Sequence, residues 1–166
     1  MRKIHNPEKI VRVFSVLDLE NHCGGSLQLP SLAHKVIQRF YSMSLPVPNQ
    51  RVIAVGRRSL ELCPHLPFLV PDARFLVRAG VDGADLSLCE VLRQESCAKR
   101  SKYVIVGSGD QIFAEPIDEL RASGTQVIVV GRRGRIHHSL YKVANQVLTL
   151  DEEVFRSTGT PVMGPS

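Results

Sequence analysis

The chain has 166 residues, of which 43% are hydrophobic and 22% charged, a composition typical of one globular domain and not of a disordered or fibrous chain. Its longest apolar runs, such as LPFLV and VIVV, are far shorter than the ~20 residues that cross a bilayer, and its basic start lacks the apolar segment of a signal peptide. We therefore expect no membrane association. The formal net charge of +5 favours an anionic partner.

The four cysteines show neither a CxxC pair nor a zinc-type grouping with histidine; they are Cys23, Cys63, Cys89 and Cys97. Most are expected to be buried thiols in a reducing compartment. A cytoplasmic location is the resulting expectation.

Strands and helices alternate along the chain. Six runs of β-branched and apolar residues predict strands at 12–17, 51–55, 74–77, 103–106, 126–130 and 146–150. Such near-continuous apolar runs are typical of strands that are buried on both faces, as in a parallel sheet. The alternation therefore predicts an α/β three-layer sandwich with a mostly parallel central sheet.

Helical periodicity fills the intervals between these strands. Apolar residues at helical spacing predict helices near 33–40, 113–120 and 136–144, and three prolines in 60–72 predict a short helix followed by irregular chain. Pro30 suits a first helical turn, and Gly124 suits a helix end. We expect one domain over 11–151, a basic N-terminal arm at 1–10 and a flexible tail at 152–166.

Acidic and polar residues follow two of the predicted strands. Asp18 ends the first strand, with Glu20 and Asn21 next, and Ser108 and Asp110 follow the fourth. Ligands of open parallel sheets bind beyond the carboxyl ends of the strands. Three local alternatives remain: a turn role for Asp18, a helix-capping pair at Ser108 and Asp110, and solvent exposure of Glu20.

A third acid lies on the helix that follows the third strand. Asp82 can cap this helix, and Asp85 then shares the apolar, sheet-facing stripe with Leu88, Cys89 and Leu92. A carboxylate on such a stripe needs a partner. The alternative is an interaction of Asp85 with the amino end of its own helix.

Asp18, Asp85 and Asp110 are thus predicted to converge at one edge of the sheet. At ~5 Å and an effective dielectric constant of ~20, each like-charge pair costs about 3 kcal/mol, so the cluster needs neutralisation. Oxygen ligands without a Cys/His set favour Mg²⁺ or Mn²⁺, which can activate water for an in-line phosphoryl displacement.

Arginines follow two other strands at the same edge and could bind phosphates; they are Arg57, Arg58, Arg132, Arg133 and Arg135. A solvated turn is the alternative for the RRGR segment. His137 and His138 follow it, and adjacent residues on a helix are expected to diverge. No nucleotide cofactor is expected, because GSGDQI lacks the last glycine of a dinucleotide fingerprint and no P-loop motif occurs.

Four segments together resemble the NYN family, a branch of the PIN-like nucleases. They are VLDLEN (16–21), GADLSL (83–88), VIVGSGDQIFAEPIDELRASGTQVIVVG (104–131) and SLYKVANQVLTLD (139–151). The resemblance implies a PIN-like, Rossmannoid fold and the activity of a metal-dependent ribonuclease. By position it assigns metal-site and catalytic roles to Asp18, Asn21, Asp85 and Asp110.

Three departures from the family pattern accompany this resemblance. Many members carry a second aspartate where this chain has Ile112, and 30–43 offers no glutamate on an early helix. In another register the helix acid would be Asp82 instead of Asp85.

The sequence therefore predicts an endoribonuclease that hydrolyses RNA with water activated by Mg²⁺ or Mn²⁺, and whose arginines bind the RNA backbone. Only 5% of the residues are aromatic and none is Trp, so few side chains can stack on bases, and we expect weak preference for particular RNA sequences. Two alternatives stay open: a catalytically weak PIN-like module that binds RNA or a protein, which Ile112 favours, and a phosphoesterase for small molecules. A homodimer is an open alternative to the monomer.

Overall fold

The structure is a computed structural model that describes residues 11–24, 29–78, 80, 82–95 and 100–151, without the side chain of Arg58. The predictions for the arm 1–10, the tail 152–166, Cys97 and the Arg58 side chain lie outside the described residues. Within the described part, no helix is long and apolar enough to cross a membrane.

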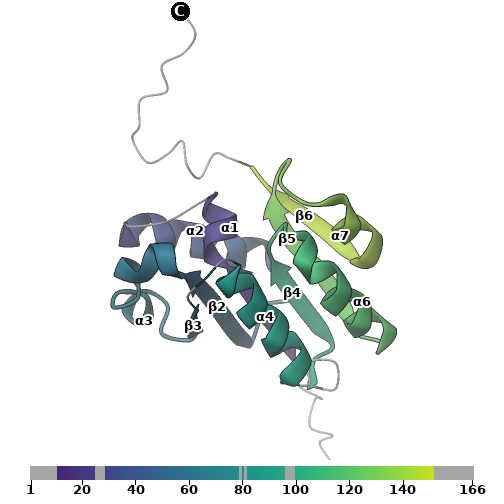
Figure 1. The fold of residues 1–166 in the computed structure, drawn as a ribbon. Coiled ribbons are helices and arrows are strands. Elements are labelled where there is room, and N and C mark those ends of the chain that lie inside the picture. The colour runs from purple at the N-terminus through teal and green to yellow at the C-terminus, as the bar shows by residue number, and fades with distance from the viewer. Residues whose placement is uncertain (1–10, 25–28, 79, 81, 96–99, 152–166) are drawn as a thin grey trace, which may run out of the picture.

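A six-stranded parallel sheet forms the centre of the domain (Figure 1). Its strands are β1 (Val13–Asp18), β2 (Gln50–Gly56), β3 (Arg74–Arg78), β4 (Tyr103–Gly107), β5 (Gln126–Arg132) and β6 (Gln146–Leu150). Their spatial order is β3-β2-β1-β4-β5-β6, and every pair is parallel. The predicted α/β sandwich is confirmed, and the sheet has the strand order of a doubly wound Rossmann-type fold.

Helical segments connect the strands. They are α1 (Leu19–Cys23), α2 (Pro30–Met43), the 3₁₀ helix η1 (Arg57–Leu62), α3 (Leu66–Leu69), α4 (Gly83–Gln94), the 3₁₀ helix η2 (Gln111–Phe113), α6 (Ala114–Ala122) and α7 (His138–Val143). Pro30 is in the first turn of α2, and Gly124, with φ of +89°, follows α6, as the sequence predicted.

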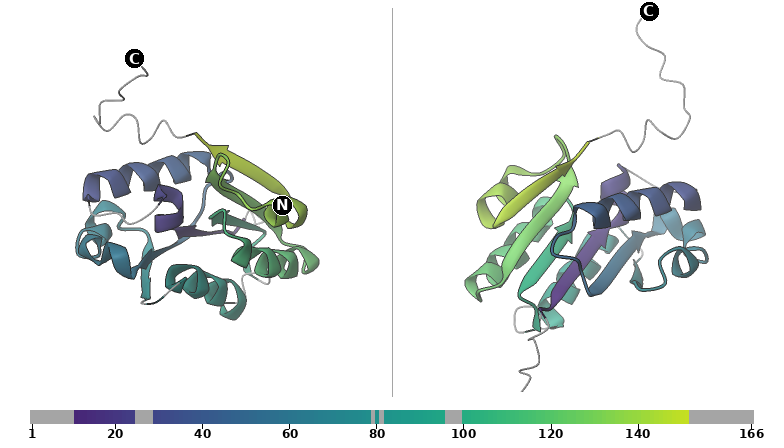
Figure 2. Two further views of the ribbon diagram at one scale, coloured as in Figure 1. Left: turned by 45° about the horizontal axis from the view of Figure 1, so that its top comes forward. Right: turned by 180° about the vertical axis from the view of Figure 1, so that it is seen from behind.

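The alternation of side chains along the strands divides the core into two layers. On one face, residues such as Val16 and Val106 pack against α4, α6 and α7. On the other face, residues such as Leu17 and Ile105 pack against α1, α2, η1 and α3. Figure 2 shows the sheet between these two groups of helices.

The strand order reverses direction between β1 and β4. The chain builds β2 and β3 on one side of β1, then returns to place β4, β5 and β6 on the other side. The loops that leave β1 and β4 therefore diverge, and such a switch point is where open α/β sheets bind ligands. Asp18 ends β1, and Asp110 lies three residues beyond β4, so both lie at the switch point.

Two local predictions need correction. The helix α1, which begins directly after Asp18, was not predicted. Asp82 precedes α4 but its side chain makes no capping hydrogen bond, because its backbone is left-handed, with φ of +57°. Capping residues normally have extended backbone, which lets the side chain turn back to the helix amides.

Candidate functional site

Asp18 and Asn21 connect the loops on either side of the switch point. Asp18 shares its side of the sheet with Val16, so its side chain emerges on the face covered by α4. Its Oδ1 accepts a hydrogen bond from the main-chain N–H of Asn21 at 3.2 Å. The Asn21 Oδ1 in turn accepts from the main-chain N–H of Gly109 at 3.0 Å. One asparagine therefore joins the end of β1 to the loop after β4.

The loop after β4 also packs tightly on the loop after β5. A Cβ atom on Gly109 would lie only 2.0 Å from the carbonyl oxygen of Arg135, so any other residue would separate the two backbones. The main-chain N–H of His137 donates to the Gly109 carbonyl oxygen at 2.9 Å. Glycine at this position brings three loops together at one edge of the sheet.

Asp110 caps the helical turn that follows it. Its Oδ1 accepts from the main-chain N–H of Ile112 at 3.0 Å, and its own main-chain N–H donates to the Ser108 Oγ at 3.2 Å. The capping alternative thus describes the local role of Asp110, while the Ser108 hydroxyl accepts the main-chain N–H of the capping residue. Asp110 is half-buried.

Asp85 lies where the helical pattern predicted. It is only 7% exposed, and it shares the buried face of α4 with Leu88, Cys89 and Leu92. Its Oδ1 atom is buried and has no hydrogen-bond partner among the described residues. A buried carboxyl oxygen without a donor costs free energy, so this atom marks a place where a proton or a cation would be stabilised.

Asp18 and Asp85 form a carboxyl pair with strongly altered acidity. Burial is the main cause that raises the pKa of Asp85 to about 9, and the hydrogen bond with Asp18 and the negative charges of Asp18 and Asp110 add to the rise. Burial and the charge of Asp110 also leave the pKa of Asp18 raised, although its hydrogen bonds to Asp85 and Asn21 lower it. At neutral pH the pair therefore retains one proton, which the two hydrogen-bonded carboxyl groups share.

The carboxyl pair faces a hollow of about 500 Å³, which we call the acidic hollow. Glu20, Arg57 and Asp82 also line it. The Glu20 Oε1 accepts from the buried Ser59 hydroxyl at 2.8 Å. A Cβ atom on Gly56 would lie 2.6 Å from Glu20 Oε2, so the glycine leaves room for this carboxylate.

Asp110 lies in a second hollow of about 390 Å³, which we call the Asp110 hollow. Arg135 and His137 line it as well, and Asn21 lines both hollows. The structure thus brings two of the three predicted acids, Asp18 and Asp85, into direct contact. Asp110 lies in the other hollow, and its negative charge raises the pKa of both. Across the described ranges, no three His, Cys, Asp or Glu side chains are grouped so that they could share a metal ion.

The predicted phosphate-binding arginines are distributed over several places. Arg57 is exposed at the acidic hollow, and Arg135 is exposed at the Asp110 hollow. Arg132 packs against the backbone of Gly24 at the end of α1. Arg133 forms an ion pair with Asp151 at 2.6 Å. One arginine at each hollow therefore flanks the carboxyl groups.

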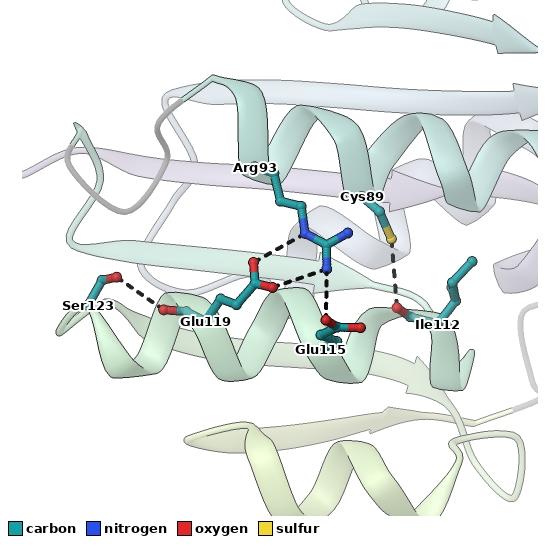
Figure 3. A network of polar contacts seen from close by, with 6 residues as sticks. All are labelled: Cys89, Arg93, Ile112, Glu115, Glu119 and Ser123. Carbon is teal, nitrogen blue, oxygen red and sulfur yellow. Dashed lines mark hydrogen bonds and ion pairs between the residues drawn. The ribbon is translucent and has the colours of Figure 1, made fainter.

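Contacts between α4 and the segment after β4 hold Asp85 in place relative to Asp110. The Arg93 guanidinium of α4 donates to both oxygens of Glu119 at 3.2 Å, and it lies 3.8 Å from Glu115. The Cys89 thiol donates to the carbonyl oxygen of Ile112 at 3.8 Å. Figure 3 shows how these side chains join α4 to η2 and α6.

Several residues of this region were missed by sequence reasoning. Ser59 and Gly56 position Glu20 from a segment that carries no acid-binding motif, so the sequence gives no signal for them. Glu20 lies on α1, so an early helix does carry a glutamate, outside the segment 30–43 where one was expected. The signal for α1 was present, because Asp18 is a capping residue type placed directly before LENHC.

Comparisons with known proteins add information on the fold. The chain matches no family model, and the comparison with curated proteins finds no match. It is similar to a solved structure of a protein of unknown function from Vibrio parahaemolyticus, with a TM-score of 0.61 and 14% identity, covering 86% of this chain and 94% of that one. Similarity at this level of identity shows a shared α/β fold.

Proposed function

We propose that this protein is a metal-dependent ribonuclease that hydrolyses RNA phosphodiester bonds at the carboxyl edge of its sheet. The observation that carries this proposal is the buried Asp18–Asp85 pair, in which the Asp85 Oδ1 has no hydrogen-bond partner within the part of the chain that the structure describes. This carboxyl pair lies at the switch point of the fold, where ligand binding is expected. Mg²⁺ and Mn²⁺ are the proposed cofactors.

The residues present fit a hard divalent cation in their chemistry. The buried ligand atoms are carboxyl oxygens, and a cation that displaces the shared proton would offset both the burial and the repulsion that raise the pKa of Asp85. Asp18 and Asp85 would hold the cation, and Asp110 contributes charge from the adjacent hollow. When bound, such a cation supplies an activated water molecule and charge neutralisation at the phosphate.

The chain's own residues would position the RNA. Arg57 at the acidic hollow and Arg135 at the Asp110 hollow can each bind a backbone phosphate. Asn21 lies between the hollows, and its side-chain oxygen is already used by Gly109, so its role is to keep both loops in place. An RNA strand that passes over Asn21 would therefore have a cationic side chain on either side of the carboxyl pair.

A nuclease assay with Mn²⁺ tests this proposal. We expect the wild type to cleave RNA and the Asp18→Asn and Asp110→Asn variants to lose most of the activity. The matched control is Asp118→Asn, an exposed acid of α6 outside both hollows, which should cleave like the wild type. A second readout is the melting temperature, which Mn²⁺ should raise in the wild type and not in Asp18→Asn.

One observation favours a different role, a catalytically weak module that binds RNA. Position 112 carries an isoleucine, and its side chain packs against the hydrophobic core next to α4. An aspartate at this half-buried position would place a further charge against the apolar core. If the wild type binds RNA in the presence of Mn²⁺ and neither it nor Asp110→Asn cleaves, this module is the function.

We also propose that the protein works in a reducing compartment such as the cytoplasm. Cys23, Cys63 and Cys89 are free thiols. Burial raises the pKa of Cys89 to about 12 and also raises that of Cys23, so both stay protonated and unreactive.

A further inference from the structure

His137 lines the Asp110 hollow and is held there from two sides. Its main-chain N–H donates to the Gly109 carbonyl oxygen at 2.9 Å, and its backbone is extended (φ −61°, ψ +139°) directly before α7. The expectation that the His137 and His138 side chains diverge is wrong, because His137 is not within the helix, and the two ring centroids are 4.2 Å apart. The half-buried His137 ring is therefore fixed between the loop after β4 and α7.

Hydrogen bonds at one edge of the His137 ring determine which nitrogen carries the proton. Nδ1 accepts from the main-chain N–H of Ser139 at 3.2 Å, so the ring caps α7. Because a main-chain N–H can only donate, Nδ1 carries no proton, and the Ser139 hydroxyl at 2.8 Å donates to it as well. The neutral ring therefore has its proton on Nε2.

The Nε2 atom of this ring is available to a ligand. Among the residues that the structure describes, it has no hydrogen-bond partner, and it is not buried. Nδ1 is turned toward α7, and the two nitrogens lie on different edges of the ring, so the edge with Nε2 is the one left to face the hollow. An N–H group that is already oriented binds an acceptor with little further loss of freedom.

The charges around the hollow favour a phosphate oxygen as this acceptor. Arg135, two residues before His137, lines the same hollow and is exposed, so it attracts an anion. Asp110 comes from the loop after β4, and its negative charge repels a phosphate toward the segment that carries Arg135 and His137. A hydrogen bond to a charged acceptor is stronger than one between neutral groups.

We infer that His137 is a neutral phosphate-binding residue, whose Nε2–H donates to a nonbridging oxygen of the phosphate that Arg135 attracts. The inference rests on the proposed function, since it takes RNA as the ligand. The ring keeps its proton throughout, so it acts as a preorganised hydrogen-bond donor and not as an acid or a base. Its Nδ1 serves only to hold the ring in place through the cap of α7.

Two substitutions separate the two nitrogens of the ring. His137→Asn keeps an oxygen acceptor near the position of Nδ1 and removes the donor at Nε2. His137→Gln places an amide N–H near the position of Nε2 and removes the capping acceptor. The matched control is His65→Asn, because His65 is an exposed histidine that precedes α3 and makes no capping hydrogen bond.

Binding is measured without cleavage, by fluorescence anisotropy of a short fluorescein-labelled RNA in EDTA at about pH 8, where an ordinary histidine is neutral. We expect His137→Asn to bind about ten-fold more weakly than the wild type, as for loss of one hydrogen bond to a charged group. The slope of log affinity against log salt concentration should not change, because no charge is lost. His65→Asn should bind like the wild type.

The melting temperatures should show the opposite pattern. His137→Asn should melt like the wild type, because the cap of α7 is kept, and His137→Gln should melt at a lower temperature while retaining most of the RNA affinity. The imidazole NMR spectrum of the free protein should place the proton of His137 on Nε2.

The inference fails if His137→Asn binds RNA as tightly as the wild type, or if its salt slope falls by about one, which indicates a cationic contact. Equal weakening in His137→Asn and His137→Gln, or a proton on Nδ1, would also overturn it. The outcome is separable from that of the proposed function. Binding that depends on His137, without cleavage in Mn²⁺, keeps the donor and removes the hydrolysis, whereas cleavage with normal binding by His137→Asn keeps the hydrolysis alone. A wild type that neither binds nor cleaves RNA contradicts both.

Discussion

At the scale of single residues, the most unusual group is the carboxyl of Asp85. It is buried on the sheet-facing side of α4 among apolar residues, next to Asp18, and this burial, together with the charge of Asp18, raises its pKa to about 9. In the unfolded chain the same group ionises near pH 4. The folded protein therefore binds more protons than the unfolded chain between these two values.

This difference predicts a pH-dependent stability. Without metal, the free energy of unfolding should fall as the pH rises from about 4 to about 9, by at most ~1.4 kcal/mol per pH unit from this group. Asp85→Asn removes the titration, and the amide can still donate to Asp18. We expect the variant to melt at a higher temperature than the wild type in EDTA, with the difference growing toward about pH 9, and to gain less from Mn²⁺.

Asp118→Asn serves as the control and should retain the pH dependence of the wild type, because Asp118 is exposed. A lower melting temperature of Asp85→Asn at every pH, with an unchanged response to Mn²⁺, would contradict the prediction. Asp85 would then be a structural partner of Asp18 and not part of a cation site.

At the scale of elements, the position of α4 relative to α6 determines how Asp85 and Asp110 are arranged. Arg93 on α4 contacts Glu119 through two hydrogen bonds with side chains that are about half exposed (Figure 3). Exposed ion pairs contribute little on average, and a two-pronged arginine–carboxylate geometry is at the upper end of that range.

A double-mutant cycle measures this contact. With Arg93→Met, Glu119→Gln and the double variant, we expect a coupling energy of about 0.5 to 1 kcal/mol in urea unfolding, smaller in high salt. The parallel cycle with Asp118→Asn, one residue earlier on α6, should give a coupling near zero. Equal coupling in both cycles would indicate a general charge effect instead of a specific link between α4 and α6.

At the scale of the whole molecule, the net charge of +5 and the two hollows define how RNA would be bound. The arginines flanking the carboxyl groups are on different loops, one after β2 and one after β5, on either side of the switch point. Each RNA phosphate that an arginine side chain neutralises releases counterions, so RNA binding should weaken steeply as the salt concentration rises.

This arrangement predicts the salt dependence of individual variants. Arg135→Gln should reduce the slope of log affinity against log salt concentration by about one and weaken binding for all RNA sequences alike. Arg39→Gln, a change on the exposed side of α2, should leave the slope unchanged. If both variants behave alike, binding would follow from overall charge and not from the Asp110 hollow.

Much of the fold could be predicted because the strands are buried on both faces. The run QVLTL was placed at 146–150, where β6 lies, and the other five strands end within two residues of their predicted limits. The stripe on α4 likewise placed Asp85 facing the sheet. Hydrophobic periodicity carries these predictions, since it records which side of an element is buried.

Features made by backbone conformation or by contacts between distant segments could not be predicted. The left-handed backbone of Asp82 removed its capping role, and the extended backbone of His137 brought its ring onto His138. Ser59 reaches Glu20 across 39 residues of sequence. None of these has a periodic or compositional signature.

The amino-acid sequence by itself determined the alternation of strands and helices, the parallel sheet and the residues at the carboxyl ends of its strands, because burial and local spacing dictate them. Only the tertiary structure decided that Asp18 and Asp85 share a proton while Asp110 lies beyond Asn21 in a second hollow. The reason is that the order of strands, and the close backbone contact at Gly109, set which loops meet, and neither is encoded within any one segment.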